Sequence, residues 1–220
     1  MQVVETIEIS DTKRIQIYND FDPQNPFTEF DTGANAWIYN DRHMTEYGDI
    51  EIPELNRQQI IDNLSDIKAL FEATSLKYIV EDYYCTNTDI VDCINDALHD
   101  HITNESGSDK LNALAAVLSM AGIKHLNTSG HGYCQGHYHE ILLTVAADDV
   151  VEERKEKLLE AVAEEYRCWA YGDVYGYVIE EKCQCCGNWN NSDVSCWGFS
   201  GASDSEGYQY MINQAKEQAA

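Results

Sequence analysis

The sequence predicts an α+β fold in which a mostly antiparallel sheet packs with several amphipathic helices. Short segments with alternating or β-branched residues lie near both ends of the chain, as strands do. Longer segments between them repeat apolar residues every three or four positions, which is typical of helices. Strand and helix segments also follow one another without the regular βαβ rhythm of parallel sheets. With 220 residues, 44% of them hydrophobic, the chain can bury a sizeable core.

The first strands are expected at the N-terminus. The segment VVETIEI alternates between apolar and polar residues, and RIQIYN follows it, so the two predict a β-hairpin. Residues 19–54 are rich in Asp, Asn, Gly and Pro and predict a long ordered loop with one short strand, AWIYN.

Three amphipathic helices and a strand are expected in the middle of the chain. The first helix covers residues 55–73, and the strand SLKYIVEDYY follows it. The second covers residues 88–103, with Thr88 as its N-cap. The third covers residues 111–121 and ends at Gly122. The predicted apolar faces of the first two are Ile60, Leu64, Ile67 and Phe71, and Ile90, Ile94, Leu98 and Ile102.

The second half of the chain completes the predicted sheet. HEILLTVAA is expected to be a buried strand, and VYGYVIEEK and SCWGFSG to form an antiparallel hairpin across a Cys- and Asn-rich loop. Residues 148–166 predict the clearest helix, and residues 208–218 a short terminal one. The inward residues of the long helix are Val151, Leu158, Leu159, Val162 and Tyr166, and the hairpin contributes Val174, Val178, Trp197 and Phe199 to the core.

No internal repeat or linker divides the sequence. We therefore expect one domain over residues 1–220, within which an acidic helical part (residues 1–127) and an α+β part (residues 128–205) are distinguishable. No apolar run reaches the length of a transmembrane helix, and the N-terminus lacks the pattern of a signal peptide, so a cytoplasmic location is expected.

The net charge excludes several classes of partner. The chain has 14 Lys and Arg against 39 Asp and Glu, a net charge of −25. Direct binding to nucleic acid would require basic residues that neutralise phosphates, and anionic membranes repel such a chain for the same reason. The expected partner is a basic protein or a cation.

Two predicted helices carry acidic residues at four-residue spacing, so that each set lies on one helix face. Like charges at this spacing cost a helix a few tenths of a kcal/mol per pair, and rows of carboxylates about 6 Å apart resemble the phosphates of a nucleic-acid strand. The alternative is a strongly solvated face. The two rows are Asp89, Asp92, Asp96 and Asp100, and Glu152, Glu156, Glu160 and Glu164.

Two segments offer metal ligands. HGYCQGHYHE holds His131, Cys134, His137 and His139, but the glycines around Cys134 indicate a turn chosen for its backbone shape. We therefore predict that it is not a catalytic metal site. The CQCCG segment contains a CxxCG knuckle, typical of one half of a structural zinc site. The candidate zinc ligands there are Cys183, Cys185, Cys186 and Cys196, with free thiols as the alternative.

Three segments together resemble a family of accessory proteins from tailed bacteriophages and prophages. They are GYCQG, WAYGDVYGYVIEE and SCWGFSG, and the resemblance covers roughly residues 128–205. The family pattern is GYSQG followed by an acid, then GDVYG, then DSCWGFYG. This chain departs from it at Cys134, where the family has Ser, and at His137, where it has an acid. The resemblance therefore implies a structural turn there, and it implies no activity.

These observations lead to one main hypothesis and two alternatives. The main hypothesis is a phage counter-defence protein without turnover, of the anti-restriction or anti-CRISPR type. It would mimic nucleic acid and block a basic groove of a host nuclease. The first alternative is a zinc-dependent enzyme that acts on a nucleotide or nucleic acid. The second is a soluble phage accessory protein whose role the sequence does not indicate.

Overall fold

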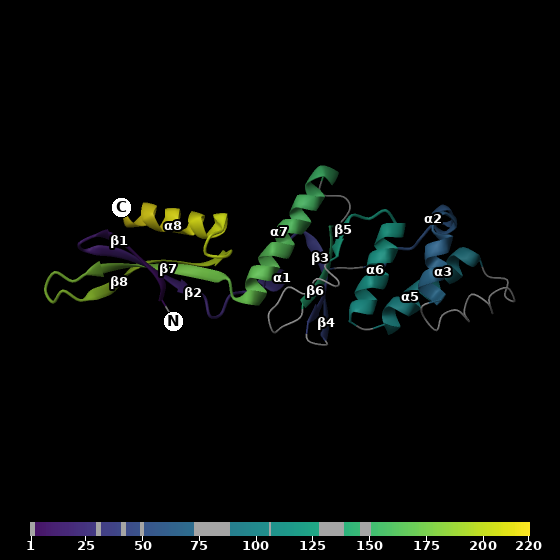
Figure 1. The fold of residues 1–220 in the computed structure, drawn as a ribbon, viewed down its shortest axis with the longest axis horizontal. Helices are drawn as coiled ribbons and strands as arrows, with labels where there is room; N and C mark the ends of the chain where they lie inside the picture. Colours follow the sequence, from purple (N-terminus) through teal and green to yellow (C-terminus); the bar gives the residue numbers. More distant parts are fainter. Residues whose placement is uncertain are drawn as a thin grey trace. The chain divides into compact units, whose positions relative to one another are not determined.

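The computed structural model confirms the predicted α+β fold (Figure 1). Within the described residues it contains seven helices and eight strands, and the strands form two antiparallel sheets of four. The structure describes residues 3–29, 32–40, 43–48, 51–72, 89–105, 107–127, 139–145 and 151–220. The predicted strand SLKYIVEDYY lies outside these residues, as does nearly all of the segment HGYCQGHYHE.

Contacts within the chain define two compact units. Unit 1 combines Met1–Thr32 with Glu164–Ala220, and unit 2 is the continuous segment Gly33–Ala163. The sequence led us to expect one domain with two distinguishable parts, residues 1–127 and residues 128–205. The observed boundaries lie elsewhere because β2, near the N-terminus, pairs with β7 across the whole intervening sequence.

The sheet of unit 1 contains the two hairpins that the sequence predicts. Its strands are β1 (Val3–Ser10), β2 (Lys13–Asn19), β7 (Val174–Lys182) and β8 (Trp189–Ser200), in the order β1-β2-β7-β8. The hairpins join through β2 and β7, which pair antiparallel from Lys13↔Glu181 to Asn19↔Tyr175. Strand β8 begins six residues earlier than the SCWGFSG segment, inside the Cys- and Asn-rich loop.

The predicted terminal helix is confirmed as α8 (Glu206–Ala219), which packs on one face of this sheet (Figure 1). The Ser205 side chain caps its N-terminus by accepting a hydrogen bond from the backbone N–H of Tyr208. The core between helix and sheet comprises Ile15, Ile17, Tyr175, Tyr177, Ile179, Tyr208, Met211, Ile212, Ala215 and Ala219.

Trp197 does not belong to this core, so that part of the hairpin prediction is wrong. A β-bulge interrupts the pairing of β7 and β8 between Tyr175↔Phe199 and Tyr177↔Cys196. The extra residue breaks the two-residue alternation and places Trp197 and Phe199 on opposite faces of the sheet. Phe199 packs against the core, whereas Trp197 is 36% exposed and covers Gly176 on the outer face. Val174 and Val178 are buried, as predicted.

The sheet of unit 2 includes more strands than the sequence indicates. Its strands are β3 (Ala34–Asn40), β4 (His43–Tyr47), β5 (His125–Asn127) and β6 (His139–Val145), in the order β4-β3-β6-β5. The AWIYN and HEILLTVAA predictions are confirmed in β3 and β6, which pair with each other. The predicted long loop instead contains the β3–β4 hairpin and the short helix α1 (Pro26–Glu29), because β4 is too short and polar to give a strand pattern.

In the described part of unit 2, four helices accompany this sheet in addition to the first part of the long helix described below. The predicted helix over residues 55–73 is divided into α2 (Arg57–Asp62) and α3 (Leu64–Glu72) at Asn63, whose backbone angles (φ −107°, ψ 16°) depart from helical values. The break leaves Leu64 exposed, although the sequence placed it on the apolar face. The other two helices are α5 (Ile90–Asn104) and α6 (Ser108–Met120), and α6 ends before Gly122 as predicted.

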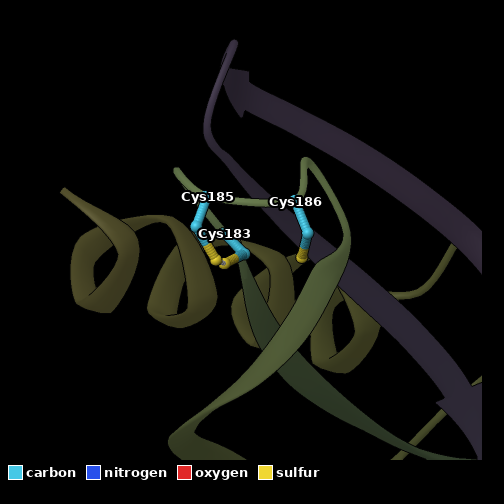
Figure 2. A group of neighbouring side chains, drawn as sticks. All are labelled: Cys183, Cys185 and Cys186. Carbon is cyan, nitrogen blue, oxygen red and sulfur yellow. Dashed lines mark hydrogen bonds between the residues drawn. The ribbon is translucent and has the colours of Figure 1, made fainter.

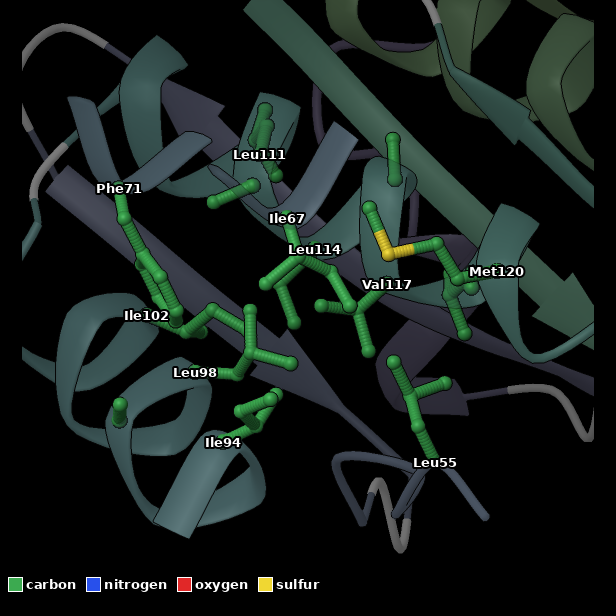
Figure 3. Close-up of a cluster of buried hydrophobic side chains, with 14 of the residues drawn as sticks. Leu55, Ile67, Phe71, Ile94, Leu98, Ile102, Leu111, Leu114, Val117 and Met120 are labelled. Carbon is green, nitrogen blue, oxygen red and sulfur yellow. The ribbon is translucent and has the colours of Figure 1, made fainter. Parts of the chain in front are cut away.

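The core of unit 2 lies among these helices and one side of the sheet (Figure 3). Ile94, Leu98 and Ile102 bury the predicted apolar face of α5, and α6 contributes the most buried residues. The buried residues of this core are Trp37, Leu55, Ile60, Ile67, Phe71, Ile94, Ala97, Leu98, Ile102, Leu111, Ala113, Leu114, Ala115, Val117, Leu118, Met120 and Leu142.

The long helix α7 (Glu152–Tyr171) includes the boundary between the two units. Leu159, Val162 and Tyr166 are buried as predicted, but Val151 precedes the helix and is exposed. The helix continues past Tyr166 and ends where the Asp173 N–H bonds to the Cys168 carbonyl, with Gly172 at a positive φ of 75°.

Candidate functional site

The predicted acidic row on α5 is exposed. Asp92, Asp96 and Asp100 follow one another at single helical turns, and among the described residues no ion pair neutralises any of the three. Asp89 is different, because it caps the helix in place of the predicted Thr88. Its carboxylate accepts a hydrogen bond from Val91 N at 2.9 Å and binds Arg57, and both contacts hold its pKa below the usual range. We call Asp92, Asp96 and Asp100 the α5 row.

The acidic row on α7 is partly neutralised. Glu156 forms an ion pair with Lys124 at 3.2 Å, and Glu164 binds the Arg167 guanidinium. The hydrogen bond from Arg167 lowers the pKa of Glu164. Glu160 is exposed, and the Glu152 side chain lies outside the described residues. The row also crosses the boundary between the units, since Glu164 belongs to unit 1 and Glu156 and Glu160 to unit 2.

A cavity of about 640 Å³ lies beside the α5 row in unit 2 and includes Asp96 in its wall. Its other acidic residues are Glu46, Glu51 and Glu54. Lys110 also lines it, but a 2.6 Å contact with Glu46 neutralises this cation. The cavity therefore extends the negative surface from the helix toward the loop that precedes α2.

A second acidic cavity, of about 540 Å³, lies in unit 1. Three carboxylates (Asp20, Asp22 and Glu165) and two indole rings (Trp169 and Trp197) line it, and none of its described wall residues is basic. The Trp169 Nε1–H donates to the Pro23 carbonyl at 3.0 Å, which fixes one ring. Carboxylates and indole faces both attract organic cations, so the wall chemistry fits a Lys or Arg side chain.

The sequence analysis did not find this cavity. Its wall comes from the β2–α1 connection, from α7 and from β8, which are far apart in the chain. The sequence shows only two acids before a proline in a segment that resembles an ordinary loop. The exposure of Trp197 follows from a bulge that the alternation does not reveal.

Three thiols gather in the turn between β7 and β8 (Figure 2). The ligand atoms of Cys183, Cys185 and Cys186 all lie within 4.8 Å of one another, so the group can hold a metal ion. The Cys183 and Cys185 sulfur atoms are 2.8 Å apart. Cys196, the fourth predicted ligand, is not part of this group, because it pairs with Tyr177 in the middle of the sheet and packs toward the α8 core.

The thiols of unit 1 differ in acidity. The hydrogen bond from Cys185 lowers the pKa of Cys183 to about 7, whereas hydrogen bonds with Cys183 and Cys186 raise the pKa of Cys185. Burial raises the pKa of Cys168, in α7, to about 11. Cys183 is therefore the more nucleophilic thiol at neutral pH, and Cys168 is inert.

Unit 1 is expected to lose stability in alkaline solution. Burial raises the pKa values of Cys168, Tyr175, Tyr177 and Tyr208, so the folded state favours their neutral forms. That stabilisation is complete below the pKa values of the unfolded chain, near 9 for Cys and 10 for Tyr, and is lost as the pH rises through the folded values. The melting temperature should therefore fall above about pH 9. Cys168→Ala should fall less steeply between pH 9 and 11, and equal slopes would contradict the assignment.

Comparison with protein-family models, with curated proteins and with solved structures finds no match to this chain. No helix in the described part of the chain is both long and apolar enough to cross a membrane. The ligand-rich segment around Cys134 and His137 lies outside the described residues, so the prediction that it is no catalytic metal site stays a prediction.

Proposed function

We propose that this protein binds a basic nucleic-acid-binding surface of another protein and blocks it without turnover. The observation that carries the proposal is the α5 row, in which three exposed carboxylates follow one helix face without an ion pair among the described residues. Like charges one turn apart destabilise a helix, so this arrangement serves no stabilising purpose within the fold.

The spacing of the α5 row supports a nucleic-acid mimic. One helical turn separates neighbouring carboxylates by about 6 Å along the axis, comparable to the distance between adjacent phosphates of a strand. A groove that binds phosphates with Lys and Arg would therefore meet carboxylates at similar intervals. The row on α7 supports this less, since Lys124 and Arg167 neutralise two of its members.

The two acidic cavities support a basic partner as well. Each presents several carboxylates around a volume that suits one or two long side chains, and the cavity of unit 1 adds two indole faces. The partner's Lys and Arg side chains, which contact phosphates when its groove holds nucleic acid, would contact negatively charged carboxylates here. Attraction of this kind speeds association and weakens with salt.

We propose a nuclease of a bacterial defence system as the target, of the restriction or CRISPR type, with the host cytoplasm as the location. The support is the resemblance of three segments to phage accessory proteins, together with the charge of −25. The proposed blocking function requires no zinc, because the three thiols line neither of the two acidic cavities.

Charge reversal of the α5 row tests the function. The variant Asp92→Lys, Asp96→Lys and Asp100→Lys is compared with a control of equal charge change, Asp11→Lys, Asp193→Lys and Glu217→Lys, whose sites are exposed in unit 1. The immobilised wild-type chain is first used to capture its nuclease from a bacterial lysate. We then measure how each variant binds this nuclease and inhibits its cleavage at about 0.05 M and 0.5 M salt. The α5 variant should bind about 10- to 100-fold more weakly at low salt, and the control within about 3-fold of wild type.

The outcomes separate the proposal from a merely solvated surface. If both variants inhibit as well as wild type and salt has no effect, the α5 row is not an interface. If both lose inhibition equally, net charge matters and the row does not. If the wild-type chain retains no nuclease and inhibits none at low salt, the proposed function is wrong.

A further inference from the structure

We propose that Cys183, Cys185 and Cys186 bind one zinc ion through three sulfur atoms and leave its fourth coordination position open to solvent or an added ligand. This site goes beyond the proposed binding function and does not depend on it. Nothing in the acidic surface requires the thiol turn, and the turn has chemistry of its own.

The positions of the sulfur atoms fit a shared ion. Zinc–thiolate bonds are about 2.3 Å long, which places the sulfurs of a tetrahedral site about 3.8 Å apart. The three sulfurs already lie within 4.8 Å of one another, so movements of about 1 Å or less would complete the coordination. Figure 2 shows the sulfur atoms of Cys183 and Cys185 side by side and Cys186 on the opposite limb of the same turn.

The backbone of the turn holds the ligands in place without an ion. Cys183 N donates to the Asn188 carbonyl at 2.7 Å, and Gly187 N donates to the Cys183 carbonyl at 2.9 Å. Gly187 has a φ of +74°, which a side chain would disfavour. Adjacent cysteines such as 185 and 186 would point to opposite faces in a strand. In this turn both sulfur atoms lie within 4.8 Å of the Cys183 sulfur, so the candidate ligand Cys185 joins the two cysteines of the CxxCG knuckle.

The type of ligand determines the class of ion, and the number of ligands determines whether the site is closed or open. Thiolates select zinc, cadmium and copper(I) over magnesium and calcium. Cys196 pairs with Tyr177, which precedes Cys183 by six residues along β7. Six residues of strand span about 20 Å, so Cys196 lies about that far from the turn. Among the described residues, the turn therefore offers three thiolates and no fourth protein ligand. Sites with three protein ligands retain an exchangeable position, unlike closed structural sites.

An intrinsic reporter lies next to the turn. Trp189 starts β8, pairs with Lys182 and carries the Arg14 guanidinium 4.4 Å from its ring centroid. The Lys182 ammonium lies 5.7 Å from the same ring. Ordering of the turn by an ion should change the environment of this indole, so its fluorescence follows binding at this end of the hairpin.

The test is a metal titration of the fully reduced full-length chain. Cobalt(II) serves as the probe, because thiolate ligation gives it characteristic charge-transfer and ligand-field absorption, and zinc then displaces it. The variant Cys183→Ser, Cys185→Ser and Cys186→Ser should bind one equivalent less than wild type and lose the thiolate bands of that equivalent. Each single variant should weaken the site at least about 10-fold, as loss of one of three ligands predicts.

Two cysteine controls make the ligand set falsifiable. Cys196→Ser and Cys93→Ser should bind like wild type, and equal loss in Cys196→Ser would show a four-ligand site and overturn the proposal. An unchanged stoichiometry in the triple variant, or no cobalt–thiolate absorption in the reduced wild type, would also overturn it.

An imidazole added to the cobalt complex should shift its ligand-field bands, and no shift would show that the fourth position is not open. Circular dichroism of each variant verifies that the substitutions leave the fold intact.

Discussion

Replacing Tyr177 by alanine is expected to destabilise unit 1 by about 3–5 kcal/mol, the usual cost of removing a large buried aromatic ring. Tyr177 is fully buried at the centre of the sheet, and its ring lies 5.9 Å from the ring of Phe199. Its hydroxyl donates to Gln218 Oε1 in α8 at 3.0 Å, so one side chain joins the sheet to the helix that covers it. Alanine would leave a cavity under α8 and an amide oxygen without its donor.

Chemical denaturation followed by tryptophan fluorescence measures this loss. Tyr177→Phe should cost only about 0.5–1.5 kcal/mol, because it removes the hydrogen bond and keeps the ring. Tyr210→Ala is the matched control on α8, since that side chain is 57% exposed, and it should change stability by about 0.5 kcal/mol or less. A cost for Tyr177→Ala similar to that control would contradict the packing of α8 on the sheet.

Replacing Gly176 by valine is expected to cost about 3 kcal/mol, although valine is a far better strand former than glycine. A Cβ atom at this position would overlap the Trp197 ring and lie 2.8 Å from the Cys196 carbonyl oxygen in the neighbouring strand. The ring can move aside because it is partly exposed, but the carbonyl belongs to the β7–β8 ladder. The substitution should therefore disturb the pairing at the bulge.

Trp197→Ala is the companion measurement. Because the ring is 36% exposed, its removal should cost about 1–2 kcal/mol, less than a buried tryptophan would. The double variant Gly176→Val with Trp197→Ala should recover part of the loss, since the ring is one of the two overlapping groups. Stabilisation by Gly176→Val alone would show that strand propensity outweighs the close approach and would contradict this structure.

Much of the fold could be predicted because period and composition report local structure directly. The alternation of VVETIEI and RIQIYN, and the apolar spacing of Ile94, Leu98 and Ile102, each describe one face of one element. Such patterns do not depend on distant partners. The exposure of the α5 row follows from the same reasoning, since the row lies opposite the buried face of α5.

The rest depended on contacts between distant segments. The sequence gives no sign that Lys124 approaches Glu156, so the neutralisation of the α7 row was not foreseen. The bulge beside Gly176 interrupts the strand alternation and leaves Trp197 exposed. The helix break at Asn63 interrupts the helical spacing and leaves Leu64 exposed. Among the predicted zinc ligands, Cys196 was included by proximity in sequence, although the strand between it and the turn separates them.

The arrangement of unit 1 has a consequence for the nascent chain. Strands β1 and β2 leave the ribosome before β7, which pairs with β2 but follows only after residues 20–173 have been made. Because synthesis proceeds at about 5–20 residues per second, β7 follows on the order of ten seconds later, and the edge of β2 stays unpaired during that time. Ile15 and Ile17 lack the cover of α8 during that interval, so an aggregation-prone edge is presented while unit 2, a continuous segment, is already complete. Synthesis that stalls before Val174 would leave this edge exposed and open to pairing with strands of other chains.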